Sequence, residues 1–141
     1  MNSDSFQHEL LIADTGPLLA LARVEMLPVL AVLFQRGFLP DVVLEECLAK
    51  PDRQDAERIR QAVNSGILTV TATLQARPQL SDLDRGEQAA IELAIQKHGC
   101  LLLDERRGRR AAKALHLKVI GALGVLLLAK SSGKIPAVSP L

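Results

Sequence analysis

The sequence contains few aromatic side chains and no pattern of paired cysteines. Its 141 residues include three Phe but no Trp or Tyr, so the core has to be built from Leu, Val, Ile and Ala. The same scarcity removes the stacking platforms with which oligonucleotide-binding folds hold single strands. Cys47 and Cys100 lack CxxC spacing, and no Cys–His spacing of a zinc site is present, which favours two buried thiols in a reducing cytosol.

An excess of one charge and long apolar runs are also missing. The chain has 17 Lys and Arg against 16 Asp and Glu, a net charge of +1, so its bulk charge does not indicate a nucleic-acid partner. Its apolar runs are far shorter than the ~20 residues that cross a bilayer. The N-terminal MNSDSFQHEL lacks the basic segment and apolar run of a signal peptide. We therefore expect a cytoplasmic protein with no membrane contact.

Short apolar runs alternate with amphipathic segments along the chain. The pattern predicts helices over residues 18–34 (with a joint before Pro28), 41–48, 52–63, 86–98, 106–115 and 122–130. Strands are expected between them, at residues 10–13, 37–40, 67–72, 100–103 and 118–120. Such alternation predicts an α/β fold with a parallel sheet covered on both faces. The length predicts a single domain over residues 1–141, with its core at about 10–135 and a polar C-terminal tail.

The stretch LLIADTGPL, residues 10–18, places Asp14 directly after the first apolar run. Asp-Thr-Gly also follows apolar strands in aspartic proteases, but those proteins are nearly all β, and here a long helical pattern follows. Two interpretations of Asp14 then remain, a metal ligand at the end of a parallel strand and a cap for the helix that begins near Pro17.

A second aspartate, Asp104, follows the apolar run at residues 100–103. Ligands of an open parallel sheet bind beyond the carboxyl ends of its strands, so the two aspartates would stand side by side if their strands are neighbours. Glu87 begins the helix before the Asp104 strand, and Glu46 lies in LPDVVLEECL, one position before Cys47 at the border of an apolar helix face. Clustered carboxylates repel unless a cation is present, and oxygen ligands alone select Mg²⁺ or Mn²⁺.

Each of these carboxylates also has an ordinary structural interpretation. Asp14 and Asp104 could cap the helices that follow them. Asp84 and Glu87 have the spacing of a capping box. Glu46 could be an exposed helix residue. The sequence leaves these alternatives open.

The segments DTGPLLALA, LPDVVLEE, LDRGEQAAIELA, LLLDERRGRRAA and GALGVLLLAK resemble those of PIN-domain proteins. More narrowly, the chain is similar to the predicted nucleic-acid-binding group related to VapC-type toxins, over residues 10 to 135. The resemblance implies a three-layer α/β/α sandwich with a central parallel sheet of four or five strands. It also implies that the first and fourth strands are adjacent.

The resemblance further implies a Mg²⁺- or Mn²⁺-dependent endoribonuclease, the toxin of a type II toxin–antitoxin pair. Its catalytic and metal-binding carboxylates would be Asp14, Glu46, Glu87 and Asp104, and Thr15 would assist through its hydroxyl or a water. The expected partners are RNA and a protein antitoxin. The strongly apolar helical region at residues 18–34 suggests a homodimer or an antitoxin-binding groove, although a larger internal core would explain it too.

The stretch ERRGRRAAKALHLK carries a local excess of positive charge. Arg107 and Arg110 are one helical turn apart and would bind RNA phosphates beside the acidic site, although a solvated basic helix face explains the same pattern. Gly108 lowers the stability of this helix and indicates either a close approach or a kink.

Two other functions are consistent with parts of the sequence. One is a catalytically silent PIN-like module that binds nucleic acid or protein. It is favoured by Leu103 directly before Asp104, because many PIN nucleases have Thr or Ser shortly before this aspartate. The other is a receiver-like phosphoacceptor domain, which the absence of an acidic pair after the first strand and of a suitably placed Lys disfavours.

Overall fold

The computed structural model describes residues 6–133, and most of the predicted polar tail lies outside them. Five strands form one sheet: β1 (Leu10–Ala13), β2 (Arg36–Pro40), β3 (Leu68–Thr71), β4 (Cys100–Leu102) and β5 (Val119–Ile120). The helices are α1 (Thr15–Arg23), α2 (Val29–Leu33), α3 (Asp41–Cys47), α4 (Gln54–Asn64), α5 (Arg85–Lys97), α6 (Arg106–Ala114) and α7 (Ala122–Ser131), with a short 3₁₀ helix at Pro78–Leu80. The predicted order of strands and helices is confirmed, with boundaries shifted by one or two residues at most ends.

All the strand pairings are parallel, and the strand order is β3-β2-β1-β4-β5. β1 therefore lies at the centre, between β2 and β4, as the family resemblance implied. Leu11 is in register with Cys100 and Ala13 with Leu102. The carboxyl ends of these two central strands consequently lie beside each other.

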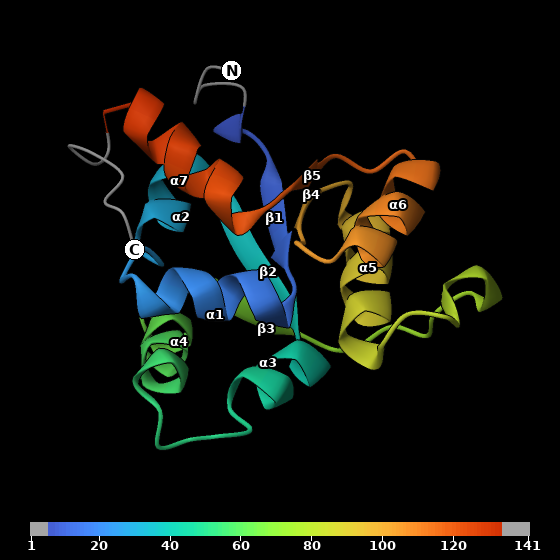
Figure 1. Cartoon of the computed structure of the whole chain (residues 1–141), viewed down its shortest axis with the longest axis horizontal. Helices are drawn as coiled ribbons and strands as arrows, with labels where there is room; N and C mark the ends of the chain where they lie inside the picture. Colours follow the sequence, from blue (N-terminus) through green and yellow to red (C-terminus); the bar gives the residue numbers. More distant parts are fainter. Residues whose placement is uncertain (1–5, 134–141) are drawn as a thin grey trace.

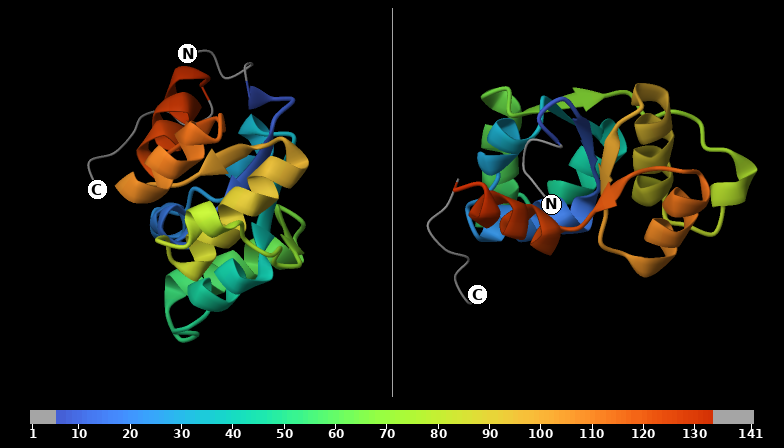
Figure 2. Two further views of the ribbon diagram at one scale, coloured as in Figure 1. Left: turned by 90° about the vertical axis from the view of Figure 1, so that its right-hand side faces the viewer. Right: turned by 90° about the horizontal axis from the view of Figure 1, so that it is seen from above.

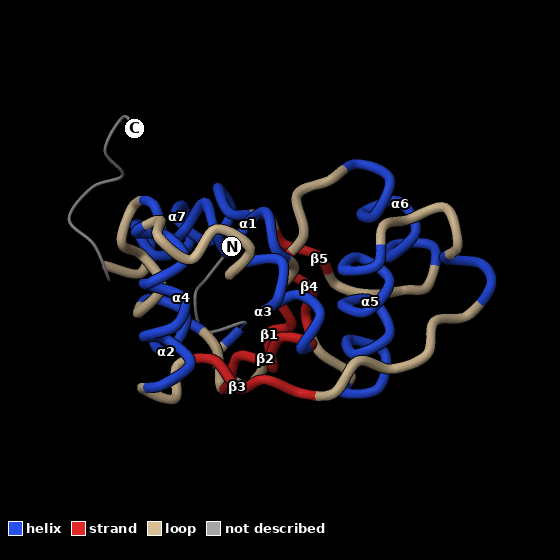
Figure 3. The backbone as a smooth tube through the Cα atoms, turned by 90° about the horizontal axis from the view of Figure 1, so that it is seen from below, coloured by secondary structure: helices blue, strands red, loops and turns tan. Residues whose placement is uncertain are grey.

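Helices cover both faces of the sheet and confirm the three-layer α/β/α sandwich. Figure 1 shows α1, α2, α4 and α7 on one side of the strands and α5 and α6 on the other, and Figures 2 and 3 show the same separation from other directions. Among the helices described over residues 6–133, none has the length and apolar character needed to cross a membrane.

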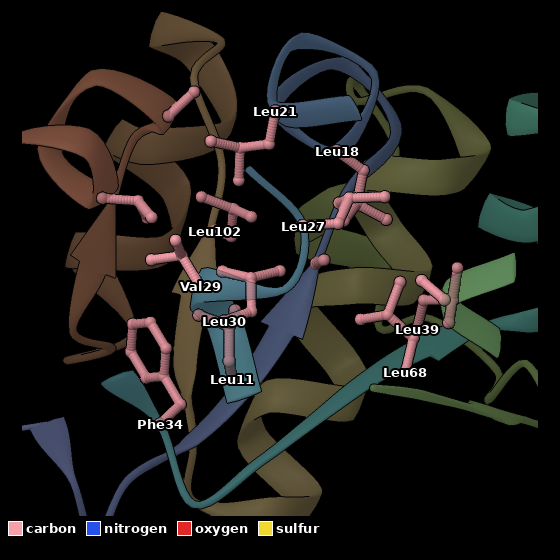
Figure 4. Close-up of a cluster of buried hydrophobic side chains, with 14 of the residues drawn as sticks. Leu11, Leu18, Leu21, Leu27, Val29, Leu30, Phe34, Leu39, Leu68 and Leu102 are labelled. Carbon is pink, nitrogen blue, oxygen red and sulfur yellow. The ribbon is translucent and has the colours of Figure 1, made fainter. Parts of the chain in front are cut away.

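Alternate residues of the central strands feed two separate hydrophobic cores. Leu11 of β1 and Leu102 of β4 pack with Leu18 of α1 and Leu30 of α2 in the larger core (Figure 4). Ile12 of β1 instead faces the smaller core under α5. This alternation follows from the two-residue period of a strand and decides which face each side chain after the strand will meet.

The connection from α5 to β4 runs unusually close to β1. His98, rather than the neighbouring Gly99, adopts the left-handed conformation that ends α5, with φ 55°. Gly99 is required for a different reason, because a Cβ there would lie 2.3 Å from Ile12 Cδ1 and 2.9 Å from the carbonyl oxygen of Leu10. The close approach keeps β4 in register with β1.

We expect Gly99→Ala to destabilise the protein by about 1–3 kcal/mol, because the added methyl group meets a backbone atom that cannot move aside. Gly16→Ala is the matched control, since a Cβ on Gly16 has no neighbour within 4 Å. A helical Gly replaced by Ala should stabilise by up to about 1 kcal/mol. Urea unfolding of both variants measures the difference, and equal stabilities would contradict the close approach.

Candidate metal centre

Asp14 lies at the end of β1, and its carboxylate does not cap the helix that follows. Its backbone N–H donates to the Leu102 carbonyl oxygen at 3.0 Å, which extends the β1–β4 ladder by one residue. It occupies the N-cap position of α1, yet its side chain makes no capping hydrogen bond. The residue is only 8% exposed. The capping interpretation therefore describes where Asp14 lies but not what its carboxylate does.

Glu46 projects from the exposed side of α3 toward the starts of two other helices. The Thr15 hydroxyl at the start of α1 donates to Glu46 Oε2 at 3.1 Å. A Cβ on Gly86, at the start of α5, would lie 2.4 Å from Glu46 Oε1. Glu46 thus lies between α1 and α5, and the Thr15 hydroxyl holds its carboxylate.

One carboxylate oxygen of Glu87 takes part in a capping box, and the other accepts no hydrogen bond in the described part of the chain. Its backbone N–H donates to Asp84 Oδ1 at 2.8 Å, and its Oε1 accepts from the Asp84 N–H at 3.2 Å. The capping interpretation is therefore correct. Glu87 is 5% exposed, and its Oε2 is buried with no hydrogen-bond partner among residues 6–133. A buried oxygen without a donor is costly, and it is available to a cation.

Asp104 shares the sheet edge with Asp14, but its carboxylate is directed elsewhere. Its Oδ1 accepts from the Ala122 N–H at 3.0 Å, in the first turn of α7. The register explains this direction, because Asp14 stands opposite Leu103 and Asp104 lies one residue further. Leu103 packs in the core under α5, so strand alternation turns Asp104 toward the opposite face, where α7 begins.

The predicted capping of α6 by Asp104 is therefore wrong. The next residue, Glu105, caps this helix and accepts from the Gly108 N–H at 2.8 Å. The expected neighbourhood of β1 and β4 is confirmed, whereas Asp14 and Asp104 have no hydrogen-bond partner in common.

The carboxylates are not gathered around one point. Within the part of the chain that the structure describes, no three Asp, Glu, His or Cys side chains converge closely enough to form a ready-made metal site. The four acidic residues predicted from the sequence instead line the carboxyl edge of the sheet as a row, which we call the acidic row: Asp14, Glu46, Glu87 and Asp104.

Burial and mutual repulsion disfavour the charged forms of three residues of the acidic row, Asp14, Glu46 and Glu87. Burial raises the pKa of Asp14 to about 7, and the nearby charges of Asp84, Glu46 and Glu105 add to the effect against a hydrogen bond from the Thr15 backbone. Burial raises the pKa of Glu46 as well, opposed by its hydrogen bond from Thr15.

Burial, followed by the neighbouring Glu105, raises the pKa of Glu87 to about 8. A protonated Glu87 can donate to Glu105, whereas the ionised carboxylate leaves its Oε2 without a partner. A divalent cation would relieve both the repulsion and the missing hydrogen bond, so the residues present fit a hard metal ion.

Three glycines make room for the carboxylates. Besides the contact of Gly86 with Glu46, a Cβ on Gly108 would lie 2.9 Å from Glu87 Oε2, and one on Gly121 would lie 2.4 Å from Asp104 Oδ1. Gly108 in α6 therefore marks a close approach, one of the two alternatives that the sequence left open. Each glycine lets a helix start against a carboxylate, which no larger residue would permit without displacing it.

Two acidic neighbours of the row were not predicted as part of the site. Asp84 was assigned only a capping role, yet its charge raises the pKa of both Asp14 and Glu46. Glu105 is the first residue of the basic stretch ERRGRRAAKALHLK, and no role was assigned to it. Its position directly after Asp104 was the signal that it lies at the same sheet edge.

Of the two arginines predicted to bind substrate, one lines a hollow and the other does not. Arg110 lines a hollow together with Asp104, Arg106, Arg109 and Lys113. Arg107 is exposed outside that lining, and its charge contributes to lowering the pKa of Glu105.

Comparison with known proteins supports this architecture. A family model described as a PIN domain matches residues 10–141. A PilT N-terminus domain protein from the hyperthermophilic archaeon Sulfolobus solfataricus P2 is similar in structure, with a TM-score of 0.60 and 17% identity over 86% of this chain and 92% of that one. A domain of a functionally unknown protein from Methanocaldococcus jannaschii DSM 2661 gives a TM-score of 0.53 and 17% identity over 80% of this chain and 90% of that one. No curated protein matches the sequence.

The pH dependence of stability tests the electrostatics of the row. Because the folded-state pKa of Asp14 is raised from 3.8 to about 7, its contribution is fully favourable below pH 4 and is lost as the pH rises through 7. We expect the free energy of unfolding in EDTA to fall between pH 5 and pH 8. Asp14→Asn should reduce that fall by on the order of 2 kcal/mol. Asp82→Asn, which removes an exposed carboxylate near the start of α5, is the matched control. Urea unfolding of the wild type and both variants gives the free energy of unfolding at each pH. If it changes equally with pH in all three proteins, the raised pKa of Asp14 is contradicted.

Proposed function

The chain belongs to the PIN-domain family, whose members are generally nucleases, and from this premise we propose that it is a Mg²⁺- or Mn²⁺-dependent endoribonuclease. The observation that carries the proposal is the pair of buried carboxylates at the carboxyl edge of the sheet. Asp14 and Glu87 are 8% and 5% exposed, and neither has a cationic side chain bonded to it in the described part of the chain. A purely structural role would leave this repulsion uncompensated.

In the proposed site, the residues that would hold the metal, directly or through water, are Asp14, Glu46, Glu87 and Asp104, and Asp104 would do so while its Oδ1 accepts from the Ala122 N–H. A bound Mg²⁺ or Mn²⁺ would polarise the phosphodiester and lower the pKa of an attacking water. The neighbouring residues then hold the carboxylates in place. Thr15 holds Glu46 through its hydroxyl, and the capping box fixes Glu87 so that its free Oε2 can accept a hydrogen bond from the attacking water.

The dispersion of the row favours a second candidate, a catalytically silent PIN-like module that binds nucleic acid or protein. Asp104 is engaged by the Ala122 N–H, and no ready-made metal site forms among residues 6–133. The two candidates differ in one respect that can be measured, because the silent module binds its partner without metal-dependent cleavage.

We also propose that the protein is the toxin of a type II toxin–antitoxin pair. An antitoxin needs a surface to bind, and α7 presents the apolar side chains of Leu123 and Leu127, which are 63% and 53% exposed. They are four residues apart and therefore lie on one side of the helix.

Purified protein should cleave labelled RNA in Mn²⁺ or Mg²⁺ and not in EDTA. We expect Asp14→Asn and Glu87→Gln each to lower the rate by on the order of a hundredfold or more, because each removes an oxygen charge from the proposed metal site. Asp82→Asn should retain full activity. If folded protein cleaves no RNA in either metal, the silent module becomes the better interpretation.

Expression in a bacterial host tests the proposed toxin role. We expect induction of the wild-type protein to arrest growth, and Asp14→Asn at the same protein level to relieve the arrest, because the arrest requires cleavage. Growth is followed by optical density and protein level by immunoblotting. Arrest by the Asn variant at equal abundance would assign the toxicity to something other than the acidic row.

A further inference from the structure

A hollow of about 480 Å³ on α6 adjoins the acidic row and is lined mainly by cations. We call it the α6 basic pocket, and its lining residues are Asp104, Arg106, Arg109, Arg110 and Lys113. The four cations follow helical spacing and gather on one side of α6. None of them forms an ion pair in the chain between residues 6 and 133. Four cations against the one carboxylate of Asp104 leave an excess of positive charge in the lining, which favours an anion.

The structure holds one of these cations in place beside the acidic row. Arg109 Nη1 donates to the Leu103 carbonyl oxygen at 3.2 Å. The same nitrogen would lie 3.1 Å from a Cβ on Gly121, the residue that makes room for Asp104. Arg109 therefore lies near Asp104 in the lining of the pocket, which also includes the exposed side chains of Arg110 and Lys113.

A second, smaller basic pocket borders the other end of the row. This hollow of about 200 Å³, the α3–α4 pocket, has the cations Arg23, Lys50 and Arg53 in its lining. Asp55 is 4% exposed and accepts from Arg23 Nε at 3.1 Å and from Arg53 Nε at 3.3 Å. The buried carboxylate fixes both guanidinium groups, and Lys50 is exposed without an ion pair in the described chain.

The order of the strands places the acidic row between the two pockets. α3 follows β2 and α6 follows β4, while Asp14 follows β1, which lies between those strands. Each pocket also shares one wall with the row: Asp104 lines the α6 basic pocket, and Glu46 lines the α3–α4 pocket. Figure 1 shows α3 at the lower centre and α6 at the upper right, well separated across the strand ends.

A third hollow, of about 490 Å³, is neither lined mainly by cations nor adjacent to the acidic row. Its lining is mostly apolar and includes Leu27, Pro28 and Ile67, and its one cation, Arg58, is paired with Glu25 at 3.5 Å. It shares no residue with the acidic row, so it does not compete for phosphate.

We propose that the two basic pockets are phosphate subsites on either side of the reacting bond. This proposal rests on the proposed nuclease function and specifies its substrate, an unbroken single strand of RNA that crosses the sheet edge and is cut internally. The strand must be flexible, because Asp14 and Glu87 are recessed and a rigid duplex cannot bend into them. The pockets contact backbone charge rather than bases, so binding should depend strongly on salt and weakly on sequence.

Binding to a fluorescein-labelled single-stranded RNA of about twelve nucleotides, long enough to span both pockets, tests the two subsites. Fluorescence anisotropy of the full chain in EDTA reports affinity without cleavage. We expect Lys113→Glu and Lys50→Glu each to weaken binding by about tenfold at low salt and to lower the salt slope by about 1, because each removes a phosphate contact. Lys130→Glu makes the same charge change near the end of α7, away from both pockets, and should stay within about twofold of the wild type. Equal affinities for the three variants would overturn the proposal.

A circular single-stranded RNA and its linear counterpart, incubated with the wild type in Mn²⁺, test whether the strand runs through the site. Equal cleavage of both is expected. Cleavage of the linear RNA alone would overturn the continuous path while leaving the nuclease function intact. If neither RNA is cut but the lysine variants lose binding as expected, the nuclease function fails and the phosphate subsites stand. A poly-glutamate peptide that competes as strongly as RNA of equal charge would instead assign the pockets to an acidic protein segment.

Discussion

The repulsion among carboxylates at the carboxyl edge of the sheet is the constraint on which the rest of this structure depends. The pairing of β1 with β4 brings two strand ends together, and the residue after each strand is an aspartate. The structure tolerates the accumulated charge by giving most carboxylates a backbone donor or a hydroxyl. Asp104 receives the Ala122 N–H, Glu105 the Gly108 N–H and Glu46 the Thr15 hydroxyl. Among the carboxylates of residues 6–133, Glu87 Oε2 is buried without a hydrogen-bond partner, and Asp14 is buried without a cationic partner, so a cation would be bound most strongly beside these two.

The fold could be predicted almost completely from the sequence, because its signals are local. The apolar run at residues 10–13 has no polar side chain to place on a solvent face, so it had to be a strand buried on both sides. The spacing of Asp84 and Glu87 likewise predicted the start of α5, and the structure forms both hydrogen bonds of that capping box. The end of α5 was harder to predict, because His98 takes the left-handed conformation that a neighbouring glycine usually adopts.

The sequence predicted where the acidic residues lie along the chain and the sheet, but not the directions in which their side chains point. The sequence placed Asp14 and Asp104 after two apolar strands, and the family resemblance implied that these strands are neighbours. Neither indicated that Asp104 lies one residue further along the register than Asp14 and bonds to the Ala122 N–H. The electrostatic effects of Asp84 and Glu105 depend on distances between helix starts that no local pattern encodes. The absence of Arg107 from the lining that includes Arg110 has a similar origin. Both are on α6, but the lining of the pocket depends on how that helix packs against Leu103 and Gly121.

Two of the acidic residues, Glu87 and Asp104, also stabilise the start of a helix, and this second role has an evolutionary consequence. Glu87 begins α5 with one oxygen, and Asp104 holds the first turn of α7 in the same way. A descendant that had lost its enzymatic function would still gain about 1 kcal/mol of stability from each such contact, and selection for folding alone would retain both acids. Finding these two residues in a relative is therefore weak evidence that the relative is an active nuclease. Asp14, whose carboxylate makes no capping bond and whose burial works against its charge, has no such reason to persist and is the more informative position.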